Sequence, residues 1–416
     1  MMTTTTPEGT GALAWFRALS GKGRRAFVGA FLGFGLDSYD YWVLPLGLTA
    51  IAATFGLDSA ETGWLSTATL ACSAVGGVVA GVLADRLGRV RTLMITVLTY
   101  ALFTALCGLA PNYETLLVLR ALQGLGFGGE WATGAILVAE YVSARDRGRA
   151  SAVIQSSWAV GWGAAVIVYT VLFRVADQDV AWRLLFLTGA LPALLVFFLR
   201  RGIEDAPAFT EHRAKARDSL RAIFRPDLLH TTVFASLLAT GCQGGYYTLA
   251  TWLPNFLAKS RGLSVVGTGG YLAFLITGAF LGYLTGGFFT DRLGRKRSIQ
   301  IFAVLSAVLL ILYTQLPTSA GDYVMYLGFP LGFCSSAIFS GFGAYLAELY
   351  PGHARGAGPA FTYNFGRGVG AFFQAAVGYL ALHYGVGGAM ALGALAYALA
   401  FVSLFWLPET RGHELR

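Results

Sequence analysis

The sequence contains one short charged motif twice, and each copy lies between two long apolar runs. The first copy is the segment 81–91, GVLADRLGRVR, and the second is the segment 287–297, GFFTDRLGRKR. Their aspartates, Asp85 and Asp291, are 206 residues apart. A chain that repeats a motif at so long an interval contains one structural unit twice.

A second pair of motifs repeats at almost the same interval. Glu140 and Arg147 in the first half correspond to Glu348 and Arg355 in the second half, with an offset of 208 residues. Because two different motifs share one period, we interpret the chain as two copies of one unit.

The composition indicates what surrounds these units. Of the 416 residues, 56% are hydrophobic and only 12% are charged, and the mean hydropathy is +0.61. So few polar side chains cannot cover the surface of a soluble protein of this length. We therefore expect an integral membrane protein in contact with the lipid bilayer.

Apolar segments long enough to cross a bilayer, at about 20 residues each, recur along the whole chain. We predict twelve spans, near 26–54, 62–84, 91–110, 115–141, 149–173, 181–199, 229–258, 267–290, 299–316, 322–349, 357–382 and 386–407. The predicted fold class is an all-α polytopic membrane protein, with twelve transmembrane helices in two pseudo-symmetric six-helix bundles.

A charged segment between the sixth and seventh spans divides the chain. We predict an N-terminal tail, a first bundle, a linker, a second bundle and a C-terminal tail, at 1–25, 26–200, 201–228, 229–407 and 408–416. Most of the 30 lysines and arginines fall in the tails, the linker and the loops of one side, which the positive-inside rule makes cytoplasmic. The net charge of +8 is therefore a topology signal, and nucleic-acid binding is not expected. The predicted location is the plasma (inner) membrane, with both termini in the cytoplasm.

These features together resemble the major facilitator superfamily. The resemblance rests on the two six-span halves, on the turn G-x-x-x-D-R-x-G-R-x-[KR] after the second and eighth spans, and on Arg120-x-x-Gln123-Gly124 in the fourth. Within the superfamily, Gly128-Gly129-Glu130-Trp131 and Pro408-Glu409-Thr410 are similar to the metabolite:proton and sialate/monocarboxylate:proton symporter branches.

The resemblance implies a secondary active transporter that works by alternating access and functions as a monomer. Its expected partners are protons and a small organic anion, a mono- or dicarboxylate, carried in symport. Sialic-acid members carry extra central membrane segments, which this chain lacks, and a smaller acid is therefore favoured. The fifth span also lacks the Gly-Pro signature of drug antiporters, reading AVGWG at 159–163. The alternative left open is a proton-driven antiporter that exports an amphipathic small molecule.

The repeated motifs are predicted to form a gate on the cytoplasmic side. Their charges can link the two halves when that side is shut and separate when it opens. The alternative is that they only set topology and anchor at lipid headgroups. The predicted gate residues are Gly81, Asp85, Arg86, Gly88, Arg89, Glu140, Arg147, Asp291, Arg292, Gly294, Arg295, Glu348 and Arg355.

A substrate site is predicted near mid-membrane, where charged side chains are costly and usually functional. Arg367 lies about ten residues, or roughly 15 Å, into the span that starts near residue 357. A guanidinium can hold a carboxylate with two hydrogen bonds. The alternative is a structural ion pair with an acid of another span. The predicted substrate contacts are Arg367, Asn364 and Gln374 on one helical face, with Gln155 and Trp158 in the fifth span and Gln243 and Tyr246 in the seventh.

Proton coupling is predicted to use acids inside the first half. Asp37 and Asp40 are three residues apart in the first span, on one helical face, and burial makes carboxylates easier to protonate. Arg120 and Glu130 of the fourth span complete the predicted set. The alternative for the aspartates is that one of them pairs permanently with Arg120 or Arg367. Glu130 is equally well explained as a hydrogen-bonding group between helices.

Enzymatic functions find no support in the sequence. All five histidines lie in loops or at the ends of spans, without metal-ligand spacing. The sequence has no phosphate-binding loop of the Walker kind, so ATP is not the expected energy source. We expect no enzyme activity, no cofactor and no metal.

Overall fold

The structure is a computed structural model that describes residues 16–17, 19–129, 147–193, 221–321 and 323–411. All regular structure in these ranges is helical. Twelve α-helices of ten or more residues are described: α2 (Gly21–Phe55), α3 (Ser59–Leu87), α4 (Arg89–Cys107), α5 (Tyr113–Phe127), α7 (Arg147–Val175), α8 (Gln178–Leu187), α11 (Pro226–Asn255), α12 (Val265–Leu293), α13 (Arg295–Gln315), α14 (Tyr323–Glu348), α15 (Ala357–Ala389) and α16 (Ala391–Ser403).

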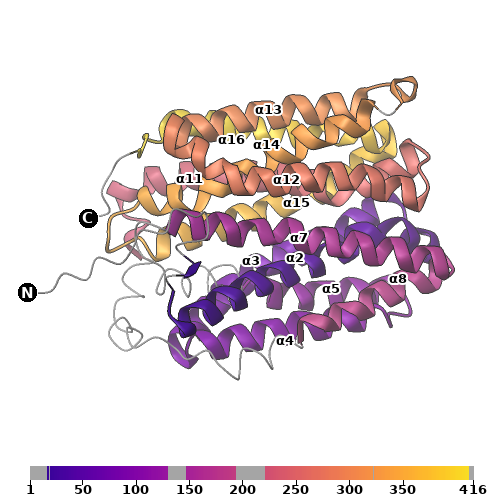
Figure 1. The fold of residues 1–416 in the computed structure, drawn as a ribbon, viewed down its shortest axis with the longest axis horizontal. Coiled ribbons are helices and arrows are strands. Elements are labelled where there is room, and N and C mark those ends of the chain that lie inside the picture. Colours follow the sequence, from indigo (N-terminus) through magenta and orange to yellow (C-terminus); the bar gives the residue numbers. More distant parts are fainter. Residues whose placement is uncertain (1–15, 18, 130–146, 194–220, 322, 412–416) are drawn as a thin grey trace, which may run out of the picture.

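The helices lie side by side along the long axis of the molecule (Figure 1). Helices α2 to α8 fill one half of the bundle, and α11 to α16 fill the other. The end of the bundle where α2 begins and α16 ends is called the terminal side below, and the other end is called the opposite side. The predicted all-α fold of two six-helix bundles is confirmed.

Six of the described helices are long and apolar enough to cross a bilayer by length and composition, namely α3, α7, α12, α13, α14 and α15. Helices α4 and α16 are apolar but shorter. Helices α2 and α11 are long enough, with 35 and 30 residues, and they carry the buried polar side chains Asp37, Asp40 and Gln243. These polar groups lower the hydropathy of the helices that line the centre.

The outer surface of the bundle is apolar, and its interior is unusually polar. Ile167, Leu395 and Leu102 are 65%, 66% and 56% exposed, whereas Arg120 and Gln374 are fully buried. Exposed aliphatic side chains are stable in hydrocarbon, where polar groups must find partners inside the protein. This pattern is that of a multi-pass membrane protein.

Most helix ends differ from their predicted positions by a few residues, and two of the differences have a clear structural cause. Helix α2 begins at Gly21, before the predicted residue 26, because the hydroxyl of Ser20 accepts a hydrogen bond from the N–H of Gly23 and caps the helix. Helix α15 continues beyond the predicted residue 382 to Ala389, with a break at Gly385, whose φ is 69°. The rest of the predicted fourth span, up to residue 141, lies largely outside the described residues.

The two halves repeat the same close helix contacts. A β-carbon at Gly76 would lie 2.1 Å from the carbonyl oxygen of Leu125, and one at Gly282 would lie 2.4 Å from that of Phe333. Gly76 and Gly282 are 206 residues apart, the interval of the charged motifs. Only glycine permits such a close approach of two helix backbones. The internal duplication is therefore present in the packing as well as in the sequence.

The halves meet mainly along two pairs of helices, α3 with α15 and α7 with α12, and also where α2 contacts α11. In the α3–α15 pair, contact is closest near the opposite side. A β-carbon at Gly378 would lie 2.3 Å from the carbonyl oxygen of Ser59, and one at Gly63 would lie 2.7 Å from that of Gln374. Toward the terminal side, the atoms of α15 nearest to a β-carbon at Gly77 belong to the side chain of Asn364 and not to its backbone. The opposite side is therefore closed by backbone contact.

We predict that Gly378→Ala prevents this closure, because two backbones would have to move apart to admit the methyl group. A cysteine placed at Ser66, which is buried on the same stretch of α3, should then react with a thiol reagent about ten-fold faster than in the parent background. Gly270→Ala is the matched control, because a β-carbon there meets open space. Equal labelling rates in the parent and Gly378→Ala backgrounds would show that the Gly378 contact does not keep this side closed.

Candidate functional site

A cavity lies between the two halves at the middle of the long helices. Seven helices contribute to it: α2, α5, α7, α11, α12, α14 and α15. Its lining residues are Phe34, Asp37, Phe127, Gln155, Trp158, Gln243, Tyr246, Tyr247, Tyr283, Phe339, Tyr363 and Arg367. Most of them are aromatic, so the cavity is suited to a flat molecule with a polar end.

Arg367 is the cation of this cavity. It lies ten residues after the start of α15 and is 4% exposed. Its guanidinium carbon lies 5.0 Å from the centre of the Tyr363 ring and 5.5 Å from that of Phe127, so two aromatic rings hold it in place. Its Nε and Nη1 atoms have no hydrogen-bond partner among the described residues. These donors are available to an anion that enters the cavity.

Asp37 and Asp40 have different surroundings, although they lie on one face of α2. Asp37 lines the cavity and interacts electrostatically with Arg367. Asp40 is fully buried inside the first half, where its Oδ2 accepts a hydrogen bond from Gln123 and its charge interacts with Arg120. The two aspartates therefore belong to separate polar groups.

Arg120 lies farther from the end of its helix than the predicted span 115–141 implied. Helix α5 begins at Tyr113, so Arg120 lies seven residues, or about 10 Å, from the helix end, and not five residues from it. Its side chain is 1% exposed and packs over the ring of Phe186 at 5.8 Å. It does not line the cavity.

Polar contacts cross the cavity from one half to the other. The indole N–H of Trp158 in α7 donates to the hydroxyl of Tyr246 in α11 at 2.8 Å. Gln155 donates to the carbonyl oxygen of Phe339 in α14 at 3.5 Å. These contacts hold the two halves together at the level of the cavity.

Of the predicted substrate contacts, five line the cavity: Arg367, Gln155, Trp158, Gln243 and Tyr246. Asn364 lies instead against Gly77, with its amide nitrogen bonded to the carbonyl oxygen of Ala360. Gln374 is fully buried two helical turns from Arg367, toward the opposite side, and is not part of the lining. Glu130 lies outside the described residues.

Several lining residues were missed in the sequence, among them Tyr247, Tyr283, Tyr363 and Phe127. One signal was available. Tyr41 and Tyr247 are 206 residues apart, and their rings lie 5.3 Å from each other, near the centre of the bundle. The repeat interval could thus have pointed to Tyr247, and Tyr363 lies one helical turn before Arg367. Tyr283 and Phe127 carry no sequence pattern.

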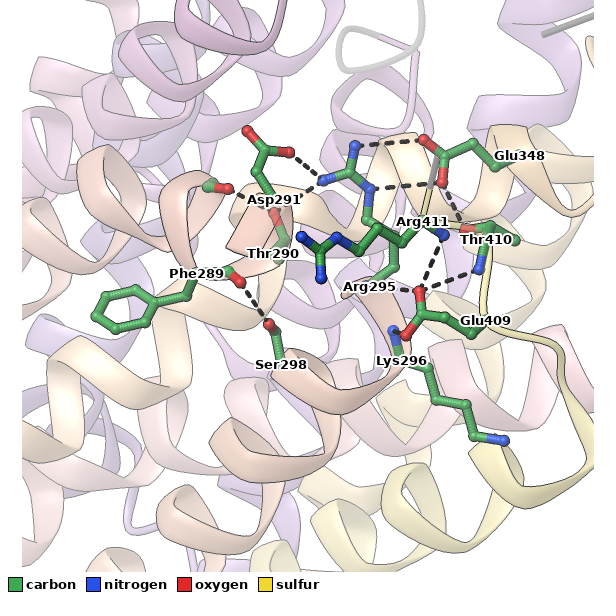
Figure 2. Close-up of polar contacts among 11 residues, drawn as sticks. Phe289, Thr290, Asp291, Arg295, Lys296, Ser298, Glu348, Glu409, Thr410 and Arg411 are labelled. Atoms are coloured by element: carbon green, nitrogen blue, oxygen red, sulfur yellow. Dashed lines mark hydrogen bonds and ion pairs between the residues drawn. The ribbon is translucent and has the colours of Figure 1, made fainter. Parts of the chain in front are cut away.

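The second copy of the gate motif forms a charged cluster on the terminal side (Figure 2). Arg295 contacts the carboxylates of Asp291 at 2.5 Å and Glu348 at 3.4 Å. Glu409 accepts hydrogen bonds from the backbone N–H groups of Arg295 and Lys296, at 2.8 and 3.2 Å, and so caps α13. Four of these residues belong to the second bundle, and Glu409 belongs to the tail that follows it.

The turn itself requires glycine in both copies. Gly88 and Gly294 have φ values of 95° and 99°, which side-chain-bearing residues rarely adopt. A β-carbon at Gly294 would also lie 2.4 Å from the carboxylate of Glu409. In the first copy, Glu140 and the side chains of Asp85, Arg89 and Arg147 lie outside what the structure describes. A gate that links the two halves therefore stays a prediction.

We predict that Glu409→Ala lowers the melting temperature of the purified protein more than Asp291→Asn does. Loss of a helix cap costs about 0.5–2 kcal/mol, whereas an exposed ion pair contributes less than about 1 kcal/mol, and the side chain of Asp291 is 72% exposed.

If Asp291 acts as a gate, Asp291→Asn should slow transport with little change in substrate affinity. Equal losses of rate and affinity would argue against the gate.

The fold and the site define a membrane transport protein, with a cavity lined by aromatic and polar side chains between two repeated bundles. The Major Facilitator Superfamily matches residues 30–357 and 271–416. The chain belongs to this family, as its motifs predict. Members of the family named below are transporters, so the protein is a transporter and not an enzyme.

Two relatives cover nearly the whole chain. One, from Cupriavidus pinatubonensis, is named a probable 4-methylmuconolactone transporter and is 38% identical over 96% of this chain and 94% of its own length. The other, the cis,cis-muconate transport protein of Acinetobacter baylyi, is 30% identical over 92% of this chain and 94% of its own length. The crystal structure of a D-xylose-proton symporter is similar in fold, with a TM-score of 0.76, 20% identity, and coverage of 94% of this chain and 99% of that chain.

Proposed function

We propose that this transporter carries a small, flat organic anion, a mono- or dicarboxylate, together with protons. The observation that carries this proposal is Arg367, a buried guanidinium with two unpartnered donor atoms among the described residues, in an aromatic-walled cavity. Leaving such a cation unpaired is costly, and a carboxylate can take two of its hydrogen bonds. The two relatives support the proposal, because both of their names refer to unsaturated organic acids.

Coupling follows if Asp37 and the substrate share one cation. Arg367 interacts electrostatically with Asp37. An arriving carboxylate can take the guanidinium if Asp37 picks up a proton, since a charged and unpaired aspartate would be costly there. Asp40, Arg120 and Glu130 are proposed as a second group that passes protons within the first half. Each transport cycle would then move a proton with the acid.

Orientation in the membrane is proposed from the basic residues. Basic residues of the described chain, among them Arg24, Arg91 and Arg297, lie on the terminal side, which we assign to the cytoplasm, with the protein as a monomer in the plasma membrane. Four basic residues, Arg174, Arg183, Lys259 and Arg261, lie on the opposite side, and two of them have structural partners there. Arg183 donates to the carbonyl oxygen of Ala110 at 2.8 Å, and Arg261 donates to that of Leu316 at 2.6 Å. Each satisfies backbone carbonyls where a helix ends.

Alternating access is proposed as rocking of the bundles 26–200 and 229–407 about the cavity. The linker 201–228, most of which lies outside the described residues, would join them in the cytoplasm. Asn255 of α11 donates to the hydroxyl of Thr49 in α2 at 3.3 Å, on the opposite side. This contact and the α3–α15 glycine contacts would separate when the cavity opens outward.

The alternative function is proton-driven export of an amphipathic small molecule. The aromatic lining favours it as much as it favours an unsaturated acid. The two functions differ in their need for Arg367, because an uncharged amphipathic cargo does not require a buried guanidinium.

We predict that Arg367→Ala removes acid binding, because hydrogen bonds to a charged group are worth about 1.5–3 kcal/mol each. Arg367→Lys should weaken binding by about ten-fold, since it keeps the charge and loses the paired donors. Calorimetry with a panel of small carboxylates provides the measurement. Arg221→Ala is the control, because Arg221 is exposed and away from the cavity. Unchanged affinity in Arg367→Ala would favour the export function.

We predict that Asp37→Asn abolishes uphill accumulation of the acid in liposomes with an imposed pH gradient. Exchange of labelled for unlabelled acid should continue, because the carrier can still bind and turn over without a titrating group. Asp40→Asn provides the comparison, since Asp40 lies away from the cavity and should slow accumulation less. Full accumulation by Asp37→Asn would exclude Asp37 as the proton carrier.

A further inference from the structure

We infer that the transported acid carries a hydrogen-bond donor, a hydroxyl or N–H group, in addition to its carboxylate, and that Gln243 receives this donor. The inference rests on the proposed function, since it takes Arg367 as the carboxylate site. It assigns Gln243 as the residue that distinguishes such acids from plain acids of the same shape.

The orientation of the Gln243 amide is fixed by its neighbour. Gln243 is 1% exposed, and its Nε2 donates to the carbonyl oxygen of Tyr363 in α15 at 2.8 Å. A carbonyl oxygen can only accept a hydrogen bond, so the amide nitrogen must face it. The amide oxygen Oε1 is therefore turned away from α15.

This oxygen is an unsatisfied acceptor in the cavity wall. Gln243 lines the cavity, and within the described part of the chain its Oε1 has no hydrogen-bond partner. The indole N–H of Trp158, another donor of the lining, is already bonded to Tyr246. Buried acceptors are nearly always paired in folded proteins, so the occupant of the cavity is the natural source of the donor.

Arg367 and Gln243, two of the polar residues of the cavity, offer opposite kinds of hydrogen-bonding group. Arg367 offers N–H donors to an anion, and Gln243 offers an acceptor, with the rings of Phe127 and Tyr363 beside the guanidinium. A flat acid that carries a hydroxyl or amino group satisfies both. An analogue that lacks the donor leaves Oε1 unpaired, and sites of this kind discriminate strongly against such analogues.

The test compares matched acids on the purified full-length protein by calorimetry. The probes are benzoate, the three hydroxybenzoates and the three fluorobenzoates, because fluorine is close to a hydroxyl in size and cannot donate. We expect at least one hydroxybenzoate to bind about ten-fold or more tightly than its fluoro analogue. In Gln243→Leu this ratio should fall close to one.

The control is Gln315→Leu, because Gln315 makes a similar bond outside the cavity. Its Nε2 donates to the carbonyl oxygen of Gly387 in α15 at 2.8 Å, and this variant should keep the ratio of the parent. Melting temperatures of both variants check that they are folded, and Gln243→Met, which also removes the acceptor and keeps the length of the side chain, replaces the leucine variant if that one unfolds.

The outcomes separate the inference from the proposed function. If hydroxy and fluoro acids bind the parent equally, or if Gln243→Leu keeps the preference, a water molecule satisfies Oε1 and the inference is wrong, while acid transport stands. If no acid binds the parent, the proposed function fails and the inference falls with it.

Discussion

A guanidinium buried between two bundles of membrane helices is the interaction on which the rest of the structure depends. Arg367 lies far from water, so its charge must be met by a carboxylate, either that of Asp37 or that of a ligand. Two aromatic rings hold it in place without neutralising it. In the proposed function the cavity always needs one negative charge, and exchange of one carboxylate for another would link binding of the acid to protonation of Asp37. In that mechanism, the need to balance the charge of Arg367 would couple binding of the acid to uptake of a proton.

The duplicated frame places this asymmetric site between two symmetric bundles. Glycines at equivalent positions, such as Gly76 and Gly282, bring helix backbones into contact in both halves. Residues related by the same interval meet where the halves join, as Thr49 and Asn255 do. The chemistry of the halves differs, because the first supplies the acids and the second supplies the arginine and Gln243. The similar packing of the two bundles would allow them to move symmetrically about the cavity, while the different side chains that each contributes would set the substrate specificity.

The sequence alone predicted the two bundles, the family and the central position of Arg367, because each depends on local composition or on the repeat. The residues that line the cavity were predicted less completely. Asn364 and Gln374 share a helical face with Arg367, but the rise along the helix moves Gln374 about 10 Å away from the cavity. Asp37 and Asp40 also share a face, and only the packing of α5 against α2 gives Asp40 its bond to Gln123. Phe127 reaches the cavity through contacts between distant segments, which no local pattern encodes, whereas Tyr363 lies one turn before Arg367 on the same helix and was overlooked.

The central claim is that binding of the acid protonates Asp37, and proton uptake on binding tests it most directly. Calorimetric titration of one acid in buffers with different ionisation enthalpies gives the number of protons taken up for each molecule bound. The account predicts close to one proton for the parent and none for Asp37→Asn, at a pH where the acid is ionised. Binding of the acid to the parent protein without proton uptake would contradict the exchange of carboxylates on Arg367.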